Sequence, residues 1–133
     1  MPRRAASVVL WVFVALWGAG ILWLSSLGPK ELPEAAFLAP DKINHFIAFA
    51  AGGWLVASAL RVSRPRLSGG ACTLLAVLLT AAFGAFDEAL QTFTPGRTGG
   101  DPYDWIADFL GAMAGALLTF TTHACLERFV ARP

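Results

Sequence analysis

The sequence predicts an all-α fold, namely a polytopic membrane bundle of four transmembrane helices with both termini on the cytoplasmic side. The first reason is composition: 56% of the 133 residues are hydrophobic and only 14% are charged, whereas a soluble domain is usually about a quarter charged. The second reason is that four apolar segments follow one another, each about as long as a helix that crosses a hydrocarbon core of about 30 Å. The breaks between them are short, so we expect a single membrane domain over residues 1–133.

The first transmembrane helix is predicted over residues 5–24, which read AASVVLWVFVALWGAGILWL. It follows Arg3 and Arg4, as the apolar core of a signal peptide would. The segment is longer than such a core, however, and no persuasive cleavage site follows it. We therefore expect a retained helix, with Ser25 and Ser26 at the membrane interface.

The other three helices are predicted over residues 43–60, 71–90 and 105–123. These spans should be helical because lipid offers no water to the backbone polar groups. The last of them contains GAMAG, from Gly111 to Gly115, and small residues four apart allow transmembrane helices to approach closely. We expect the motif to serve packing within one chain; a dimer face is the alternative, and the sequence leaves the oligomeric state open.

The distribution of basic residues predicts the orientation. Four spans place the N-terminus, the loop at residues 61–70 and the C-terminus on one side, which the positive-inside rule makes cytoplasmic. This side carries seven of the ten basic residues: Arg3, Arg4, Arg61, Arg64, Arg66, Arg128 and Arg132. Eight of the nine acidic residues fall at or near the opposite face. A multi-pass protein of the cytoplasmic (inner) membrane is therefore expected.

The extracytoplasmic face gathers polar residues from three helix ends. Residues three or four apart share one face of a helix, and the pairs with this spacing are Asp41–His45, Glu88–Gln91 and Asp104–Asp108. The connection TFTPGRTGGDP is rich in Gly and Pro and is expected to fold Arg97 back over the acids. So much charge needs a reason, since an unpaired Asp at mid-membrane costs about 2.5–3.5 kcal/mol.

Two interpretations of this charge stay open. In the first, the residues line a polar pocket that opens to the extracytoplasmic side; the ligand-binding candidates are Lys42, His45, Asp87, Glu88, Gln91, Arg97, Asp101, Asp104 and Asp108. In the second, they form an interfacial cap in which Arg97 and Lys42 hold acids at helix ends. No cofactor is predicted, but carboxylates beside one His leave a divalent metal open.

Two stretches resemble the signature blocks of the VanZ-like family. DKINHFIAFA contains the pattern K-x-x-H, which falls on Lys42 and His45. FDEALQTFTPGRTGGDPYDWIADFLGAMAG contains the pattern E-x-x-Q-x-F-x-P-x-R, from Glu88 to Arg97, and then a D-x-x-x-D-x-x-G helix start from Asp104. The resemblance covers about residues 41–116 and rests on the combined pattern.

The resemblance implies an integral membrane protein with a polar site on its outer face and a role in the cell envelope. The family takes its name from a protein linked to low-level resistance to the glycopeptide teicoplanin, so a relation to antibiotic resistance is part of the expectation. The resemblance implies no particular reaction.

We expect the protein to bind or handle a cell-envelope ligand, such as a lipid headgroup or a lipid-linked precursor, with membrane lipids as its partners. The main alternative is a membrane-embedded hydrolase or transferase, with Glu88 or Asp104 as general base and His45 as acid or base. A small transporter and a structural or regulatory membrane partner are further alternatives. The net charge of +1 and the lack of a basic stripe argue against a nucleic-acid partner.

Overall fold

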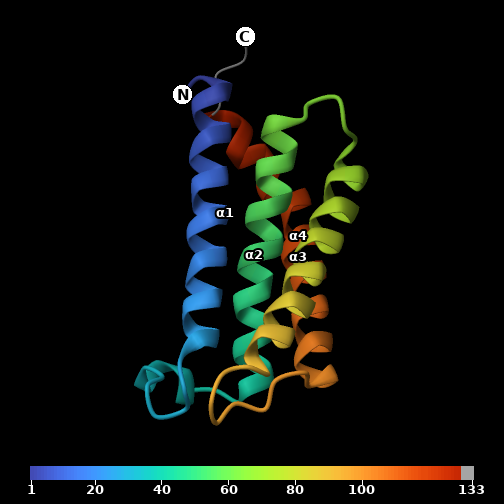
Figure 1. Ribbon diagram of the computed structural model, residues 1–133. Helices are drawn as coiled ribbons and strands as arrows, with labels where there is room; N and C mark the ends of the chain where they lie inside the picture. Colours follow the sequence, from blue (N-terminus) through green and yellow to red (C-terminus); the bar gives the residue numbers. More distant parts are fainter. Residues whose placement is uncertain (130–133) are drawn as a thin grey trace.

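The computed structural model describes residues 1–129, and the regular elements of this range are helices. In chain order they are α1 (Arg3–Ser26), the short 3-10 helix η1 (Glu34–Phe37), α2 (Asp41–Ser63), α3 (Gly69–Gln91) and α4 (Pro102–Phe129). Within residues 1–129, four helices, α1 to α4, are long and apolar enough to cross a membrane. The predicted all-α bundle is therefore confirmed (Figure 1). Arg132, which the orientation prediction counts as cytoplasmic, lies outside the described residues.

Each long helix begins and ends a few residues outside its apolar segment, because polar and proline residues at the ends continue the helical backbone. Helix α2 begins directly after Pro40, whose φ is −54°. The Ser68 hydroxyl oxygen accepts a hydrogen bond from the Ala71 N–H at 3.1 Å and so caps the start of α3. The first residue of α4 is Pro102, a residue that fits the first turn of a helix because its missing N–H has no partner there.

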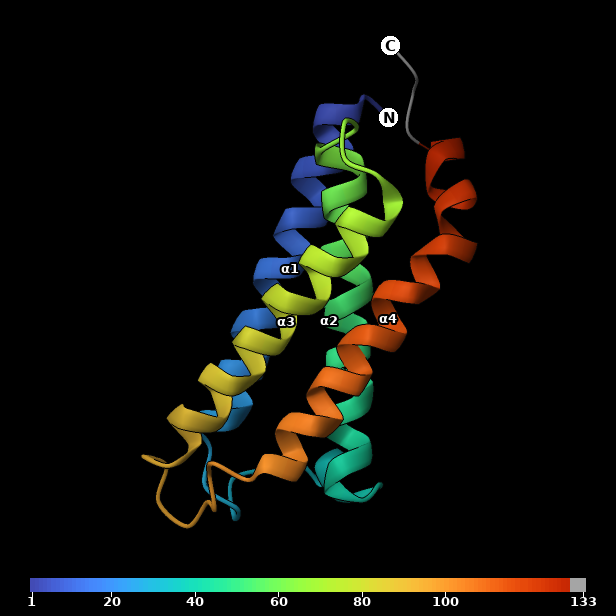
Figure 2. The same cartoon turned by 90° about the vertical axis from the view of Figure 1, so that its right-hand side faces the viewer.

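The four long helices run up and down, so that their connections alternate between two ends (Figure 1). The N-terminus, the α2–α3 connection and the end of α4 lie at one end. The connections at residues 27–40 and 92–101 lie at the other, which we call the loop end (Figures 1 and 2). This is the alternation that the orientation prediction requires, and it brings the three polar helix ends together.

Helices α2 and α4 pack backbone to backbone through glycines. A Cβ atom built on Gly53 of α2 would overlap the Ala112 carbonyl oxygen of α4. Conversely, a Cβ on Gly115 of α4 would overlap the Ala50 carbonyl oxygen, and Gly111 faces α2 in the same way. The prediction that the GAMAG motif serves packing within one chain is thus confirmed.

Helix α1 is attached to α2, near the N-terminus by Arg3, which donates to two α2 carbonyl oxygens, and further along by Trp17. Its indole N–H donates a hydrogen bond to the Ala48 carbonyl oxygen at 2.8 Å, and its ring meets Phe49 edge-on with the centroids 5.5 Å apart. A Cβ on Gly52 would overlap the indole ring, so the glycine makes the space that Trp17 fills. Most of the remaining α1 surface is exposed, as suits a helix that faces lipid.

We predict that Gly115→Ala lowers the midpoint of thermal unfolding in mild detergent. Alanine has a higher helix propensity by up to about 1 kcal/mol, but overpacking against a backbone carbonyl costs about 1–3 kcal/mol. Gly20→Ala is the matched control, since a Cβ at Gly20 of α1 meets no atom within 4 Å. Tryptophan fluorescence during heating measures both, and equal midpoints for the two variants would contradict the packing argument.

Candidate functional site

Lys42, in the first turn of α2, lies between two acids at the start of α4. Its ammonium group donates to Asp101 Oδ2 at 2.6 Å and also to Asp104 Oδ1. Asp101 additionally accepts the Tyr103 N–H at 2.8 Å. These two donors, the ammonium group first, hold the pKa of the Asp101 carboxyl below its ordinary value. The contact ties the start of α2 to the start of α4.

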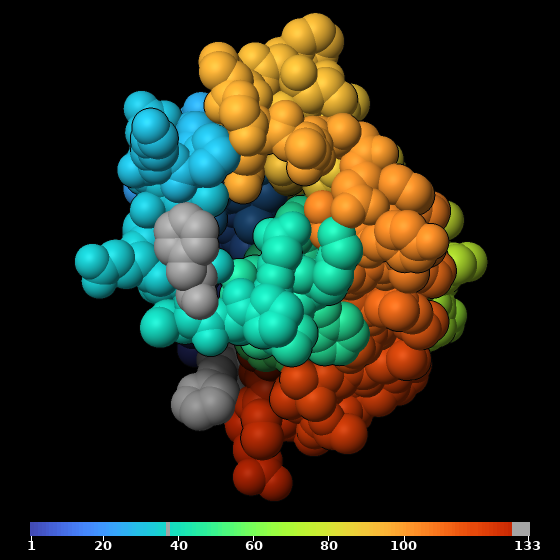
Figure 3. Space-filling view, turned by 90° about the horizontal axis from the view of Figure 1, so that it is seen from below, coloured from blue at the N-terminus to red at the C-terminus, as the bar shows by residue number. Residues whose placement is uncertain are grey.

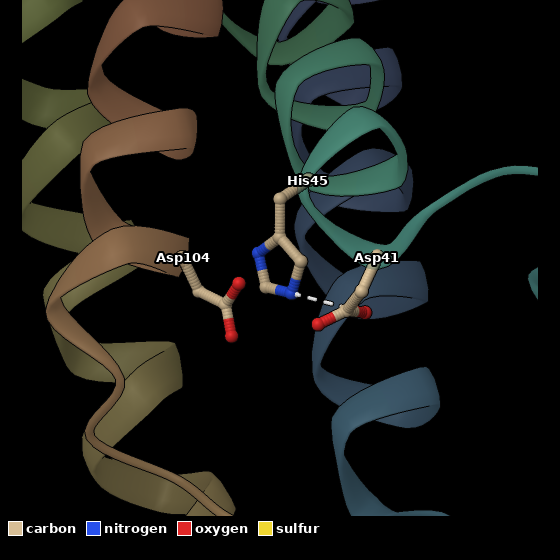
Figure 4. Close-up of side chains that lie close together, drawn as sticks. All are labelled: Asp41, His45 and Asp104. Carbon is tan, nitrogen blue, oxygen red and sulfur yellow. Dashed lines mark ion pairs between the residues drawn. The ribbon is translucent and has the colours of Figure 1, made fainter.

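His45 lies one turn further along α2 and is mostly buried, with 15% of its side chain exposed. Its Nδ1 lies 2.8 Å from Oδ1 of Asp108, whose side chain is fully buried. On the other side of the ring, Nε2 lies 3.9 Å from Asp41 Oδ1. Figure 4 shows the imidazole between Asp41 of its own helix and Asp104 of α4. The predicted shared face of Asp41 and His45 is therefore confirmed, and His45 lies among three carboxylates.

Glu88 of α3 binds the returning loop. Its Oε2 accepts the Gly100 and Asp101 N–H groups at 3.1 and 3.2 Å, while its Oε1 accepts the Gln91 amide at 3.4 Å. The loop reaches Glu88 because Gly100 adopts a φ of +77°, a conformation that favours glycine. A Cβ on Gly99 would overlap backbone atoms of Gln91, so close approach also requires glycine there. Glu88 thus has a clear structural task, closing the end of α3 onto residues 92–101.

A cavity of about 630 Å³ lies at the loop end, between α1, the start of α2, the end of α3 and the two loop-end connections. Figure 3, a view onto this end, shows the recess with atoms of the N-terminal part of the chain at its depth. Its apolar wall includes Ile21, Leu24 and Phe49. Its polar residues are Ser25, Asp41, Asn44, His45, Asp87, Gln91, Arg97 and Thr98.

Two buried polar atoms among these residues have no hydrogen-bond partner within residues 1–129. They are Oδ1 of Asp87, a residue 1% exposed, and Nε of Arg97. The other Asp87 oxygen accepts the Gln91 amide at 3.0 Å. One Arg97 Nη donates to the Leu24 carbonyl oxygen at 3.4 Å. Each side chain is thus held by one contact and keeps a second polar atom unpaired.

The expectation that Arg97 folds over the acids is not met: among residues 1–129 it forms no ion pair within 4.0 Å with a carboxylate. The reason lies in the loop, which packs against the end of α1 through the Thr94 hydroxyl and the Ser25 carbonyl oxygen at 2.8 Å. Arg97 therefore meets the carbonyl end of α1, where the helix dipole favours a cation.

The structure divides the nine predicted site residues into two groups. Beside α4 lie Lys42, His45, Glu88, Asp101, Asp104 and Asp108. At the cavity lie Asp87, Gln91 and Arg97, with His45 also reaching its wall.

The cavity also contains polar residues that were not predicted as site residues, among them Ser25 and Asn44. Ser25, expected at the interface, is 5% exposed, and its hydroxyl lies 3.4 Å from the Gln91 amide nitrogen. Asn44 donates to the carbonyl oxygens of Ala36 and Ala39, at 2.8 and 3.2 Å, and so holds the η1 segment over the cavity. An amide at the start of an apolar span was the available signal for Asn44.

Comparison with known proteins gives a family match. A family model described as VanZ/LLP1 matches residues 7–123, which covers all of the cavity and most of the four long helices. No curated protein and no solved structure matches this chain.

We predict that Lys42→Met raises the pKa of Asp101 toward its ordinary value of about 3.9, because the main group that stabilises its charged form is removed. A carboxyl group whose pKa is lower in the folded than in the unfolded protein stabilises the fold at pH values above its ordinary pKa. This stabilisation is lost as the pH falls through the pKa of the folded state. The contribution of the Lys42–Asp101 contact to the stability of the loop end should therefore fall in acid in the wild type, with less pH dependence in the variant. Carboxyl ¹³C NMR titration in detergent, with Lys30→Met as control, measures the pKa; an unchanged value in Lys42→Met would refute this account.

Proposed function

Because this chain belongs to the VanZ/LLP1 family, we propose that it is a multi-pass membrane protein that binds the polar headgroup of a membrane amphiphile in its loop-end cavity. The ligand class includes lipid headgroups and lipid-linked precursors of the cell envelope. The loop end faces the extracytoplasmic side of the cytoplasmic membrane in this proposal, with both termini in the cytoplasm, as the distribution of arginines favours.

The observation that carries the proposal is that two residues lining the cavity, Asp87 and Arg97, each keep a buried polar atom, Oδ1 and Nε, without a hydrogen-bond partner within residues 1–129. A buried polar group without a partner costs about 1–3 kcal/mol, and more when it is charged. A bound headgroup that supplies one hydrogen-bond donor and one acceptor would remove both costs. The cavity volume of about 630 Å³ lies within the usual range for small-ligand sites.

The two atoms also limit the chemistry of the headgroup. Arg97 presents an N–H donor, which suits a phosphate or carboxylate oxygen. Asp87 presents an acceptor, which suits a hydroxyl, amide or amine. A headgroup that joins an anionic group to sugar or peptide donors offers both, and lipid-linked envelope precursors have this composition.

The cavity wall supports an amphiphile rather than a purely polar solute. Ile21 and Leu24 of α1 and Phe49 of α2 give the cavity apolar sides. Helix α1 itself is mostly exposed along its length, as a lipid-facing helix is. A headgroup in the cavity would therefore keep its hydrocarbon chain beside α1, within the membrane.

A contribution to low-level teicoplanin resistance belongs to the proposal and rests on the family relationship alone. It would follow if the protein withheld or altered the envelope precursor that a glycopeptide recognises. The minimal inhibitory concentration of teicoplanin in a strain that expresses the protein, compared with one that expresses Arg97→Ala, tests this part separately.

A membrane-embedded hydrolase or transferase is the second candidate function, and the His45–Asp108 pair favours it. A buried carboxylate at 2.8 Å orients the imidazole, and His45 also lines the cavity, where it would serve as general base or acid. Turnover of a lipid-linked substrate by purified protein, lost in His45→Gln, would support this candidate. Headgroup binding without turnover would leave only the binding function.

We predict that Arg97→Ala weakens headgroup binding about tenfold or more, because a hydrogen bond to a charged group contributes about 1.5–3 kcal/mol. Native mass spectrometry of the delipidated protein, titrated with a polyprenyl phosphate and with phosphatidylglycerol, measures the affinity. Asp87→Asn should also weaken binding, since it replaces an anionic oxygen with an amide.

Lys30→Ala is the matched control for this experiment, because Lys30 is an exposed cation at the loop end that does not line the cavity. It removes the same charge and should leave the affinity unchanged. Equal affinities for the wild type and Arg97→Ala, with folding intact in both, would refute the proposed function.

A further inference from the structure

Three helices contribute one potential metal ligand each to a single point beside the cavity. His45 comes from α2, Glu88 from α3 and Asp108 from α4, and their ligand atoms all lie within 4.8 Å of one another. We propose that these three side chains bind a divalent cation of the Zn²⁺ or Mn²⁺ type. This goes beyond headgroup binding and does not depend on it.

A second observation points into the same space. The Asp108 side chain is fully buried, and while Oδ1 contacts His45, Oδ2 has no hydrogen-bond partner within residues 1–129. Oδ2 faces α3: a Cβ built on Gly84 would lie only 2.9 Å from it. Gly84 is one turn before Glu88 on the same face of α3. The unpaired oxygen is therefore directed toward the gap between α4 and the helix that carries Glu88.

The charges around this point also call for a cation. Four carboxylates are buried at the loop end, those of Asp87, Glu88, Asp104 and Asp108. Lys42 pairs with Asp104 and His45 contacts Asp108, whereas the groups of residues 1–129 that donate to Glu88 are backbone and amide N–H groups. Burying an ionised carboxylate without a counter-ion is costly. A divalent cation between Glu88 and Asp108 would neutralise both while His45 stays uncharged.

The ligand set indicates which cation. Mg²⁺ and Ca²⁺ prefer shells made of oxygen alone, whereas an imidazole nitrogen with two carboxylates suits Zn²⁺ or Mn²⁺. Three protein ligands leave at least one coordination position open for water or another ligand.

A neighbouring group, Asp41, His45 and Asp104, meets the same distance criterion. It is the weaker candidate, because 66% of the Asp41 side chain is exposed and Asp104 is already bound to Lys42. The two groups share His45, so one cation at a time is expected.

The test is metal stoichiometry and affinity. Protein purified in mild detergent is stripped with a chelator, supplied with ZnCl₂ or MnCl₂, separated from free metal and analysed for metal and protein content. We expect about one tightly bound cation per chain in the wild type, and at least a tenfold weaker affinity in His45→Ala and in Asp108→Asn. The control is His123→Ala, which removes the histidine at the opposite end of α4, 3.6 Å from Glu127, and should bind as the wild type does.

A wild type that retains no cation, or a His45→Ala variant that binds as tightly as the wild type, would overturn the proposal. If a variant does not fold, the cation content of the reloaded wild type still tests the proposal. Co²⁺ bound at one nitrogen and two oxygen ligands gives visible absorption bands that Zn²⁺ abolishes by competition, and the lack of such bands would count against the site.

Repeating the lipid titration on chelator-stripped protein separates this proposal from the preceding one. Lipid binding that persists in stripped wild type and is lost in Arg97→Ala would leave headgroup binding standing even if no cation binds. Cation binding without lipid binding would support the cation site and refute the proposed headgroup binding.

Discussion

The close approach of α2 and α4 is the constraint on which the rest of the structure depends. Glycines on both helices remove the side chains that would separate the two backbones. At this separation the polar side chains of the loop end meet, Lys42 with Asp104 and His45 with Asp108. In lipid, packing of this kind replaces the hydrophobic drive that brings helices together in water. The packing motif and the polar cluster are therefore two parts of one arrangement.

The polar residues of the loop end do two kinds of work. Lys42 and Glu88 close the structure: Lys42 joins the start of α2 to the start of α4, and Glu88 holds the returning loop by its backbone N–H groups. These contacts fit the interpretation of the charges as an interfacial cap. Asp87 and Arg97 line the cavity, and each has a buried polar atom that no group of residues 1–129 pairs with, which fits the interpretation as a pocket. The cap and pocket interpretations therefore apply to different residues of the same cluster and do not exclude each other.

His45 connects the two parts. It lines the cavity, contacts the fully buried Asp108, and lies near Asp41 of its own helix. Headgroup binding, acid–base chemistry and cation binding would each use this residue differently. A neutral imidazole is required for coordination and a charged one for a strong ion pair, so an occupant of the proposed site would change the contacts of His45 according to its own chemistry.

The sequence by itself determined the helices and their alternation, because a run of apolar residues long enough to cross a bilayer leaves the backbone no other stable conformation. It also identified the polar face, since His45 follows Asp41, and Asp108 follows Asp104, at the spacing of one helical turn. Tertiary structure alone decided which partners these residues meet. The turn of Arg97 toward the carbonyl end of α1, the burial of Ser25 and the capture of the loop by Glu88 depend on how separate helices pack. Spacing along one helix carries no information about distances between helices, and for that reason the cavity and the three-helix ligand group could not be read from the sequence.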